Sequence, residues 1–204
     1  MQPSEVLAYE PRVLTQQQRE FYFQNGYLLV EAVVPPEWLD RLRAATEEMV
    51  DRSRALTRSD RIFDLERGHS ADEPRLRRLT SPVDHHPEYW AFASEAGSVL
   101  PEIMADLVGP DVKFHHSKLN FKVAHGGEEV KWHQDIQFFP HTNYSVMTIG
   151  TYLHDCGSDQ GPLGVLPGSH EGPLYDQYNK RREWVGCLSD EDVAQLDLAK
   201  AVYL

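Results

Sequence analysis

The stretch KWHQDIQFFP (Lys131–Pro140) places a histidine and an aspartate two residues apart among apolar and aromatic side chains. On a β-strand, side chains at this spacing point to the same face, with Cα atoms about 7 Å apart. We therefore expect His133 and Asp135 to converge. Most H-x-D pairs are ordinary polar contacts, but a carboxylate without a partner is costly in apolar surroundings. A metal ion would remove that cost, because an imidazole and a carboxylate are two of the three ligands of a 2-His-1-carboxylate iron site.

The length suits one domain, or one domain with an appended lobe, and the composition is acidic. The chain has 204 residues, with 32 acidic and 20 basic side chains and a formal net charge of −12. Such a charge disfavours nucleic acid and anionic membranes as partners. The N-terminus does not resemble a signal peptide, and no apolar run approaches the roughly 20 residues of a membrane span. Two cysteines, Cys156 and Cys187, give no disulfide framework, so we expect a reducing, cytoplasmic location.

The first half of the chain is predicted to be mainly helical. Caps and apolar periodicity indicate helices over 14–26, 35–56 and 87–109, the last region holding two helices that end at Gly109. The apolar run 27–34 is predicted to be a short buried strand. The charged stretch 52–78 is predicted to be a long irregular excursion.

The second half shows the pattern of β-strands. Alternating residues over 112–124 are followed by a predicted Gly126–Gly127 turn, and further strands are expected over 128–135, 145–155 and 163–170. After Pro173 the sequence becomes polar, and a last strand is expected near 200–204. Helices followed by strands predict an α+β fold in which helices support an antiparallel β structure.

Four stretches together resemble one protein family. They are LTQQQREFYFQNGYLLVEAVV (14–34), HHSKLNFK (115–122), GGEEVKWHQD (126–135) and GPLGVLPGSHEG (161–172). The series resembles the phytanoyl-CoA dioxygenase family of Fe(II)- and 2-oxoglutarate-dependent oxygenases. The resemblance implies a double-stranded β-helix, the jelly-roll or cupin architecture, buttressed by N-terminal helices. We expect a single domain over 1–204, with a helical part at 1–110 and the first part of the β-helix at 111–204.

The resemblance also implies the site residues. It makes His133 and Asp135 iron ligands, and it places Lys118 and Asn120 on the preceding strand, facing 2-oxoglutarate or substrate. Lys118 would meet a carboxylate as a point charge and Asn120 would hydrogen-bond it. A solvated Lys118 is the alternative at about even odds.

Three further residues are implied as lining the 2-oxoglutarate pocket. Thr148 and Gly150 lie on the strand after H-x-D, where ordinary strand packing is the slightly favoured alternative. Arg78 matches a basic residue that reaches the pocket from the N-terminal half in relatives, although Arg77 lies beside it. The other histidines are expected to be structural or on the surface, and His170 belongs to a turn that shapes the barrel.

The sequence departs from the family at its end. In relatives the second iron histidine lies about 80 or more residues after H-x-D and is followed by an arginine that pairs with 2-oxoglutarate. Here 71 residues follow His133, none after His170 is histidine, and the last arginine is Arg182. We expect a fragment of a longer protein, because a barrel without its last strands would expose open edges.

We therefore predict an Fe(II)/2-oxoglutarate-dependent dioxygenase that uses O₂ to hydroxylate an aliphatic carbon of a small molecule. Asp135 favours hydroxylation over halogenation, since halogenating relatives lack this carboxylate. The alternatives are a non-catalytic cupin-like binding protein with a vestigial metal centre, and a redox-neutral metal-cupin enzyme such as an isomerase.

Overall fold

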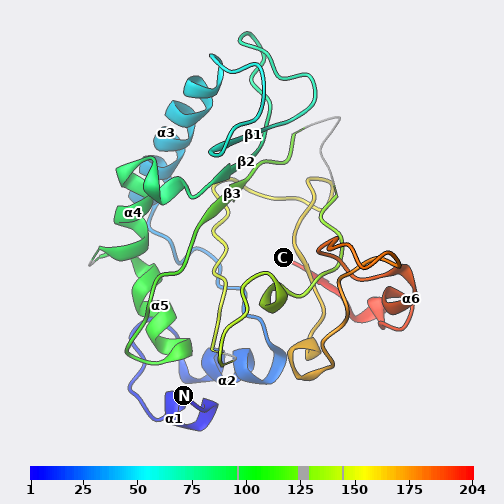
Figure 1. The fold of residues 1–204 in the computed structure, drawn as a ribbon. Helices are drawn as coiled ribbons and strands as arrows, with labels where there is room; N and C mark the ends of the chain where they lie inside the picture. Colours follow the sequence, from blue (N-terminus) through cyan, green and yellow to red (C-terminus); the bar gives the residue numbers. More distant parts are fainter. Residues whose placement is uncertain (96, 124–128, 144) are drawn as a thin grey trace.

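The computed structural model describes residues 1–95, 97–123, 129–143 and 145–204, and it shows an α+β fold of helices and small sheets (Figure 1). The predicted Gly126–Gly127 turn lies outside the described residues. The α-helices are α1 (Pro3–Leu7), α2 (Gln16–Asn25), α3 (Pro36–Ser53), α4 (Pro87–Ser94), α5 (Val99–Val108) and α6 (Asp190–Val193). The 3₁₀ turns are η1 (Pro82–Asp84), η2 (Asp135–Gln137), η3 (Ser169–Glu171) and η4 (Leu198–Lys200), and the strands are β1 (Phe63–Leu65), β2 (Leu76–Thr80), β3 (Lys118–Asn120), β4 (Gly164–Val165) and β5 (Val202–Tyr203).

The predicted helices are confirmed, because their local signals are strong. Thr15 accepts the backbone N–H of Gln18 at the start of α2, and Gly26 ends that helix with φ of 78°. A left-handed C-cap of this kind favours glycine. In α3, Trp38, Leu42 and other residues at helical spacing form a buried stripe. None of the described helices combines the length and apolar character needed to cross a bilayer.

The three-stranded antiparallel sheet β1–β2–β3 has one apolar and one polar face. Across its ladder, Phe63 pairs with Leu79 and Leu79 with Leu119, and these side chains belong to the main core with α3 and α4. The neighbouring pair, Arg78 with Asn120, must point the other way because side chains alternate along strands. Helices α3, α4 and α5 lie along one side of this sheet, and the segments after β3 lie along the other (Figure 1).

Several strand predictions were wrong. Residues 27–34 form no strand. Leu28, Val30 and Val33 pack half-buried against a small cluster around Leu14, Ile103 and Leu107. The excursion 52–78 instead supplies β1 and the start of β2. No described residue of 129–135 or 145–155 is in a strand, whereas the predicted strand near the end is present as β5, paired with β4.

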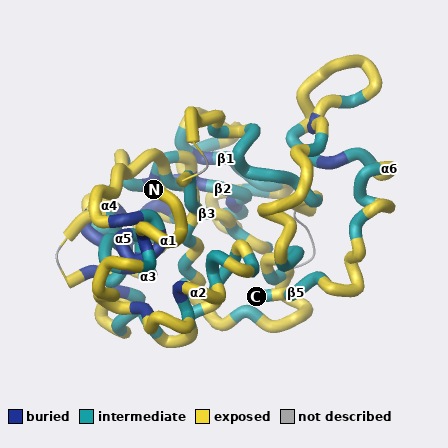
Figure 2. The backbone as a smooth tube through the Cα atoms, turned by 90° about the horizontal axis from the view of Figure 1, so that it is seen from below, coloured by how far each residue is buried: buried dark blue, intermediate teal, exposed yellow. Residues whose placement is uncertain are grey.

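The core of the molecule lies in its N-terminal half. Buried residues gather around α3–α5 and the first sheet, while the later chain is mostly exposed or half-buried (Figure 2). Of the described residues after Gly109, only Gln177 and Leu188 are buried. The part that carries the H-x-D motif is therefore held largely by hydrogen bonds to neighbouring segments.

Two buried ionic side chains tie the N-terminal segment to α5. Asp106 is 2% exposed and accepts the backbone N–H groups of Arg12, Val13 and Leu14 at 2.8, 2.9 and 2.8 Å. Arg19 is fully buried and donates from Nε to the carbonyl of Asp106 at 3.0 Å. Since buried N–H groups need acceptors, the carboxylate fixes the path of the chain into α2.

We expect Asp106→Ala to lower the free energy of unfolding by about 3 kcal/mol, because it leaves three backbone donors without their acceptor. Urea denaturation measures this loss. Asp111→Ala, on an exposed aspartate just after α5, is the control and should change stability by less than about 0.5 kcal/mol. Equal effects of the two substitutions would contradict the anchoring role of Asp106.

Candidate metal centre

The side chains of His133 and Asp135 converge as the spacing predicts, but not from a strand. His133 Nε2 lies 3.1 Å from Asp135 Oδ1. Asp135 opens the 3₁₀ turn η2, which is closed by the bond from Phe138 N–H to the Asp135 carbonyl, while Gln134 between the two residues is extended. An extended residue followed by a tight turn therefore brings the two polar groups together.

Each member of this pair has a second hydrogen bond that orients it. His133 Nδ1 lies 2.8 Å from the carbonyl of Lys131, which can only accept, so Nδ1 carries a proton. Thr148 donates its hydroxyl to Asp135 Oδ2 at 3.2 Å. The bonds to Nδ1 and Oδ2 direct Nε2 and Oδ1 toward each other, and histidine ligands of metals are commonly held by such outer bonds.

The electrostatics of the pair favour its charged form. The hydrogen bond to Asp135 raises the pKa of His133 above its usual 6.5, against the opposing effect of burial. The same bond lowers the pKa of Asp135 below its usual 3.8, and the Lys118 charge lowers it further. Imidazole nitrogen binds a metal only when deprotonated, so an ion bound here would take the place of the proton shared by the pair.

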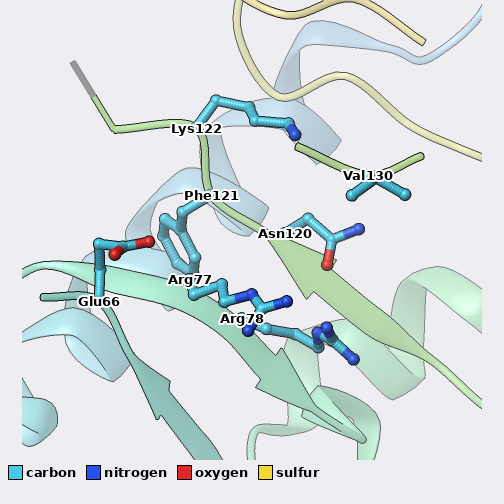
Figure 3. A pocket seen from close by; sticks show the side chains of 7 residues that line it. All are labelled: Glu66, Arg77, Arg78, Asn120, Phe121, Lys122 and Val130. Atoms are coloured by element: carbon cyan, nitrogen blue, oxygen red, sulfur yellow. The ribbon is translucent and has the colours of Figure 1, made fainter. Parts of the chain in front are cut away.

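The polar face of the first sheet carries three of the predicted residues. Lys118 is within electrostatic range of both His133 and Asp135, since its charge lowers the pKa of each. Arg78 and Asn120, which pair across β2 and β3, line a small cavity of about 20 Å³ beside this face (Figure 3). Arg78 Nε is buried and has no hydrogen-bond partner among the described residues.

Of the two remaining predicted residues, Thr148 hydrogen-bonds to Asp135, and Gly150 has no such bond among those of the described residues. Thr148 is expected to line the 2-oxoglutarate pocket, and in the structure its hydroxyl donates to Asp135 Oδ2. Gly150 is exposed, and an added Cβ there would meet no atom within 4 Å. Among the described residues, no group of three or more His, Cys, Asp or Glu side chains is arranged to hold a metal ion.

Among the described histidines outside the pair, His170 has a structural contact and three others form a cluster of rings, while His125 lies outside the described residues. His170 Nε2 lies 3.1 Å from the Phe23 carbonyl at the end of α2, and its ring fills the space where a side chain on Gly26 would be. His115, His116 and His141 gather in edge-to-face ring contacts near the site. The sequence offered no signal for this cluster, because His141 is distant in the chain from the other two.

We expect NMR titration of the metal-free protein to give a His133 pKa above 6.5 and Asp135→Asn to lower it, because the main cause of the shift is the bond to Asp135. A raised folded-state pKa means that this bond stabilises the fold fully below 6.5, and that the stabilisation is lost as pH rises through the folded-state value. Asp155→Asn, on an exposed aspartate, is the control. An unchanged His133 titration in Asp135→Asn would contradict the geometry.

Comparison with known proteins places this site in context. The family model described as "Phytanoyl-CoA dioxygenase (PhyH)" matches residues 22–196. A protein of Stutzerimonas stutzeri named probable alpha-ketoglutarate-dependent hypophosphite dioxygenase is 29% identical over 168 residues, covering 82% of this chain and 57% of that protein. Human peroxisomal phytanoyl-CoA dioxygenase is 27% identical over 169 residues, covering 79% of this chain and 49% of its own length. This chain therefore spans about half the length of these relatives.

A solved structure shares the fold over the whole chain. EctD from S. alaskensis with bound Fe superimposes with a TM-score of 0.66 at 21% identity, covering 100% of this chain and 69% of EctD. A second EctD structure, with 2-oxoglutarate and 5-hydroxyectoine, gives a TM-score of 0.65. With the family model matching most of its length, the chain belongs to the phytanoyl-CoA dioxygenase family.

Proposed function

We propose that this chain carries part of the active centre of an Fe(II)- and 2-oxoglutarate-dependent dioxygenase that hydroxylates an aliphatic carbon of a small molecule. The observation that carries the proposal is the convergence of His133 Nε2 and Asp135 Oδ1 at 3.1 Å. Family membership and the relatives named as dioxygenases support it. The β-helix core expected for the family is part of the same proposal.

The donor set fits one edge of an iron site. Two ligands at right angles, each about 2.1 Å from an ion, lie about 3.0 Å apart, close to the observed separation of His133 Nε2 and Asp135 Oδ1. An imidazole and a carboxylate are also the ligand types of the non-haem iron triad. Iron(II) bound by the pair would supply the redox chemistry that couples O₂ and 2-oxoglutarate to oxidation of a C–H bond.

The surrounding residues orient His133 and Asp135 for metal binding and supply groups for the 2-oxoglutarate that would bind beside them. The bond from His133 Nδ1 to Lys131 holds the ring in the tautomer whose Nε2 can ligate. Thr148 occupies Oδ2 and so favours ligation through Oδ1. Lys118, Asn120 and Arg78 share one sheet face, and we propose that they provide the charge and donors for the carboxylates of 2-oxoglutarate.

We expect His133→Ala and Asp135→Ala each to weaken Fe(II) or Co(II) binding by more than about 100-fold, because even outer-sphere partners are worth 10- to 100-fold. Iron-dependent succinate formation from 2-oxoglutarate should fall in parallel. Calorimetry under anaerobic conditions and succinate detection are the measurements. His154→Ala, on an exposed histidine, is the matched control, and metal binding that survives both site substitutions would refute the proposal.

Replacing Lys118 tests the anion site separately from the metal site. We expect Lys118→Ala to weaken binding of 2-oxoglutarate to the metal-loaded protein by at least about tenfold, the value of one charge-assisted hydrogen bond. Metal affinity should stay within a few-fold of the parent protein. The control is Lys113→Ala, which replaces an exposed lysine five residues before Lys118. An unchanged affinity for 2-oxoglutarate in Lys118→Ala would mean that Lys118 is merely solvated.

A further inference from the structure

Residues 173–188, here called the bracing segment, contain the two residues that are buried in the described chain after Gly109. Gln177 is fully buried and Leu188 is 7% exposed. A buried glutamine amide is uncommon because desolvating it is costly unless it is hydrogen-bonded. Its burial in an otherwise exposed region indicates that a specific contact holds it there.

The contact of Gln177 is with the residue between the two proposed metal ligands. Gln177 Nε2 donates to the main-chain carbonyl of Gln134 at 2.9 Å. The Gln134 side chain also bonds to the bracing segment. Its Nε2 donates to the Pro173 carbonyl at 3.0 Å, and its Oε1 accepts from Tyr175 N–H at 2.9 Å. Gln134 is therefore held at both its main chain and its side chain by one neighbouring segment.

Further contacts continue this attachment on both sides of Gln134. Leu188 N–H donates to the Trp132 carbonyl at 2.8 Å, and Gln137 Nε2 donates to the Tyr175 carbonyl. The ring of Trp184 packs edge-on against Phe138, which in turn packs edge-on against His133. The whole H-x-D turn is thus bonded along its length to the bracing segment.

Gln177 is itself held rigidly enough to transmit this constraint. Its main-chain carbonyl accepts N–H groups from Val185 and Gly186 at 3.1 and 3.3 Å, within the bracing segment. The carbonyl of Gln134 belongs to the peptide that leads into Asp135. Its direction therefore sets how the Asp135 carboxylate meets His133, and Gln177 is the side chain that fixes this direction.

We propose that Gln177 is a positioning residue that fixes the angle between His133 and Asp135 for metal binding. The proposal rests on the function proposed above, and it adds a residue that lies 43 positions from Gln134 in the chain. Gln177 does not touch the ion. Its effect passes through the Gln134 peptide, in the way that outer hydrogen bonds orient metal ligands.

The test replaces Gln177 by methionine, which keeps the length of the side chain and removes the amide. Gln177 Oε1 is buried without a hydrogen-bond partner, so replacing this oxygen removes no hydrogen bond. The bond from Nε2 to the Gln134 carbonyl is the one that is lost. Gln195→Met is the matched control, because Gln195 also donates its amide to a backbone carbonyl, that of Glu191, but from an exposed position. Both variants are first checked for cooperative thermal unfolding.

Two measurements are made on the 204-residue chain. In a Co(II) titration followed by visible absorption, we expect the dissociation constant to rise about tenfold in Gln177→Met and to stay unchanged in Gln195→Met. In the metal-free protein at one fixed pH, we expect the ¹⁵N chemical shift of His133 Nε2 to move toward that of a ring without the Asp135 bond in Gln177→Met only.

The outcomes separate this proposal from the function on which it rests. A folded Gln177→Met protein with parental Co(II) affinity and parental His133 shift overturns the positioning role, as does an equal loss in Gln195→Met. If Gln177→Met does not fold, Gln137→Met breaks another bond to the bracing segment, and a parental affinity there overturns the role instead. If the 204-residue chain binds no Co(II), the two ligands that it carries do not suffice for a metal site, and the His133 shift alone decides the positioning role.

Discussion

The alternation of side chains along β2 and β3 is the constraint on which the candidate site depends. Because Leu79 and Leu119 must enter the core against α3 and α4, Arg78, Asn120 and Lys118 are forced onto the opposite face. A one-residue shift in register would bury the cations and expose the leucines. The packing of the apolar core therefore decides which polar side chains occupy the opposite face, among them Lys118, whose charge acts on His133 and Asp135.

The two halves of the molecule are held by different forces. The helical half buries a contiguous set of apolar side chains, whereas the described part of the later half buries only Gln177 and Leu188. Where little apolar surface is buried, backbone and amide hydrogen bonds must define the conformation, and each missing partner carries a larger penalty than its presence gains. This makes the geometry around His133 and Asp135 depend on a few named bonds.

The sequence predicted what is decided locally. Thr15, Gly26 and the apolar stripe of α3 act within one or two turns, and these helices are confirmed. Strand predictions failed at 27–34 because apolar residues can pack against a cluster without a ladder partner. They failed in the opposite sense at 52–78, where strands β1 and β2 pair across charged residues whose apolar neighbours face the core. Periodicity reports which side chains seek burial, and it does not report which backbone will pair with which.

The contrast between local signals and contacts of distant segments also explains which features of the candidate site could be predicted. The spacing of His133 and Asp135 was enough to predict their convergence, although a turn rather than a strand achieves it. The role of Thr148 on Asp135 and that of Gln177 on Gln134 depend on contacts across 13 and 43 residues, for which a single sequence carries no signal. The overall charge of −12 is equally uninformative here, because Lys118, the cation whose charge acts on the pair, is placed by sheet register. Charges within the screening length of about 8 Å act on one another more strongly than the distant net charge does, so the effect of Lys118 on the pair is compatible with the acidic composition of the chain.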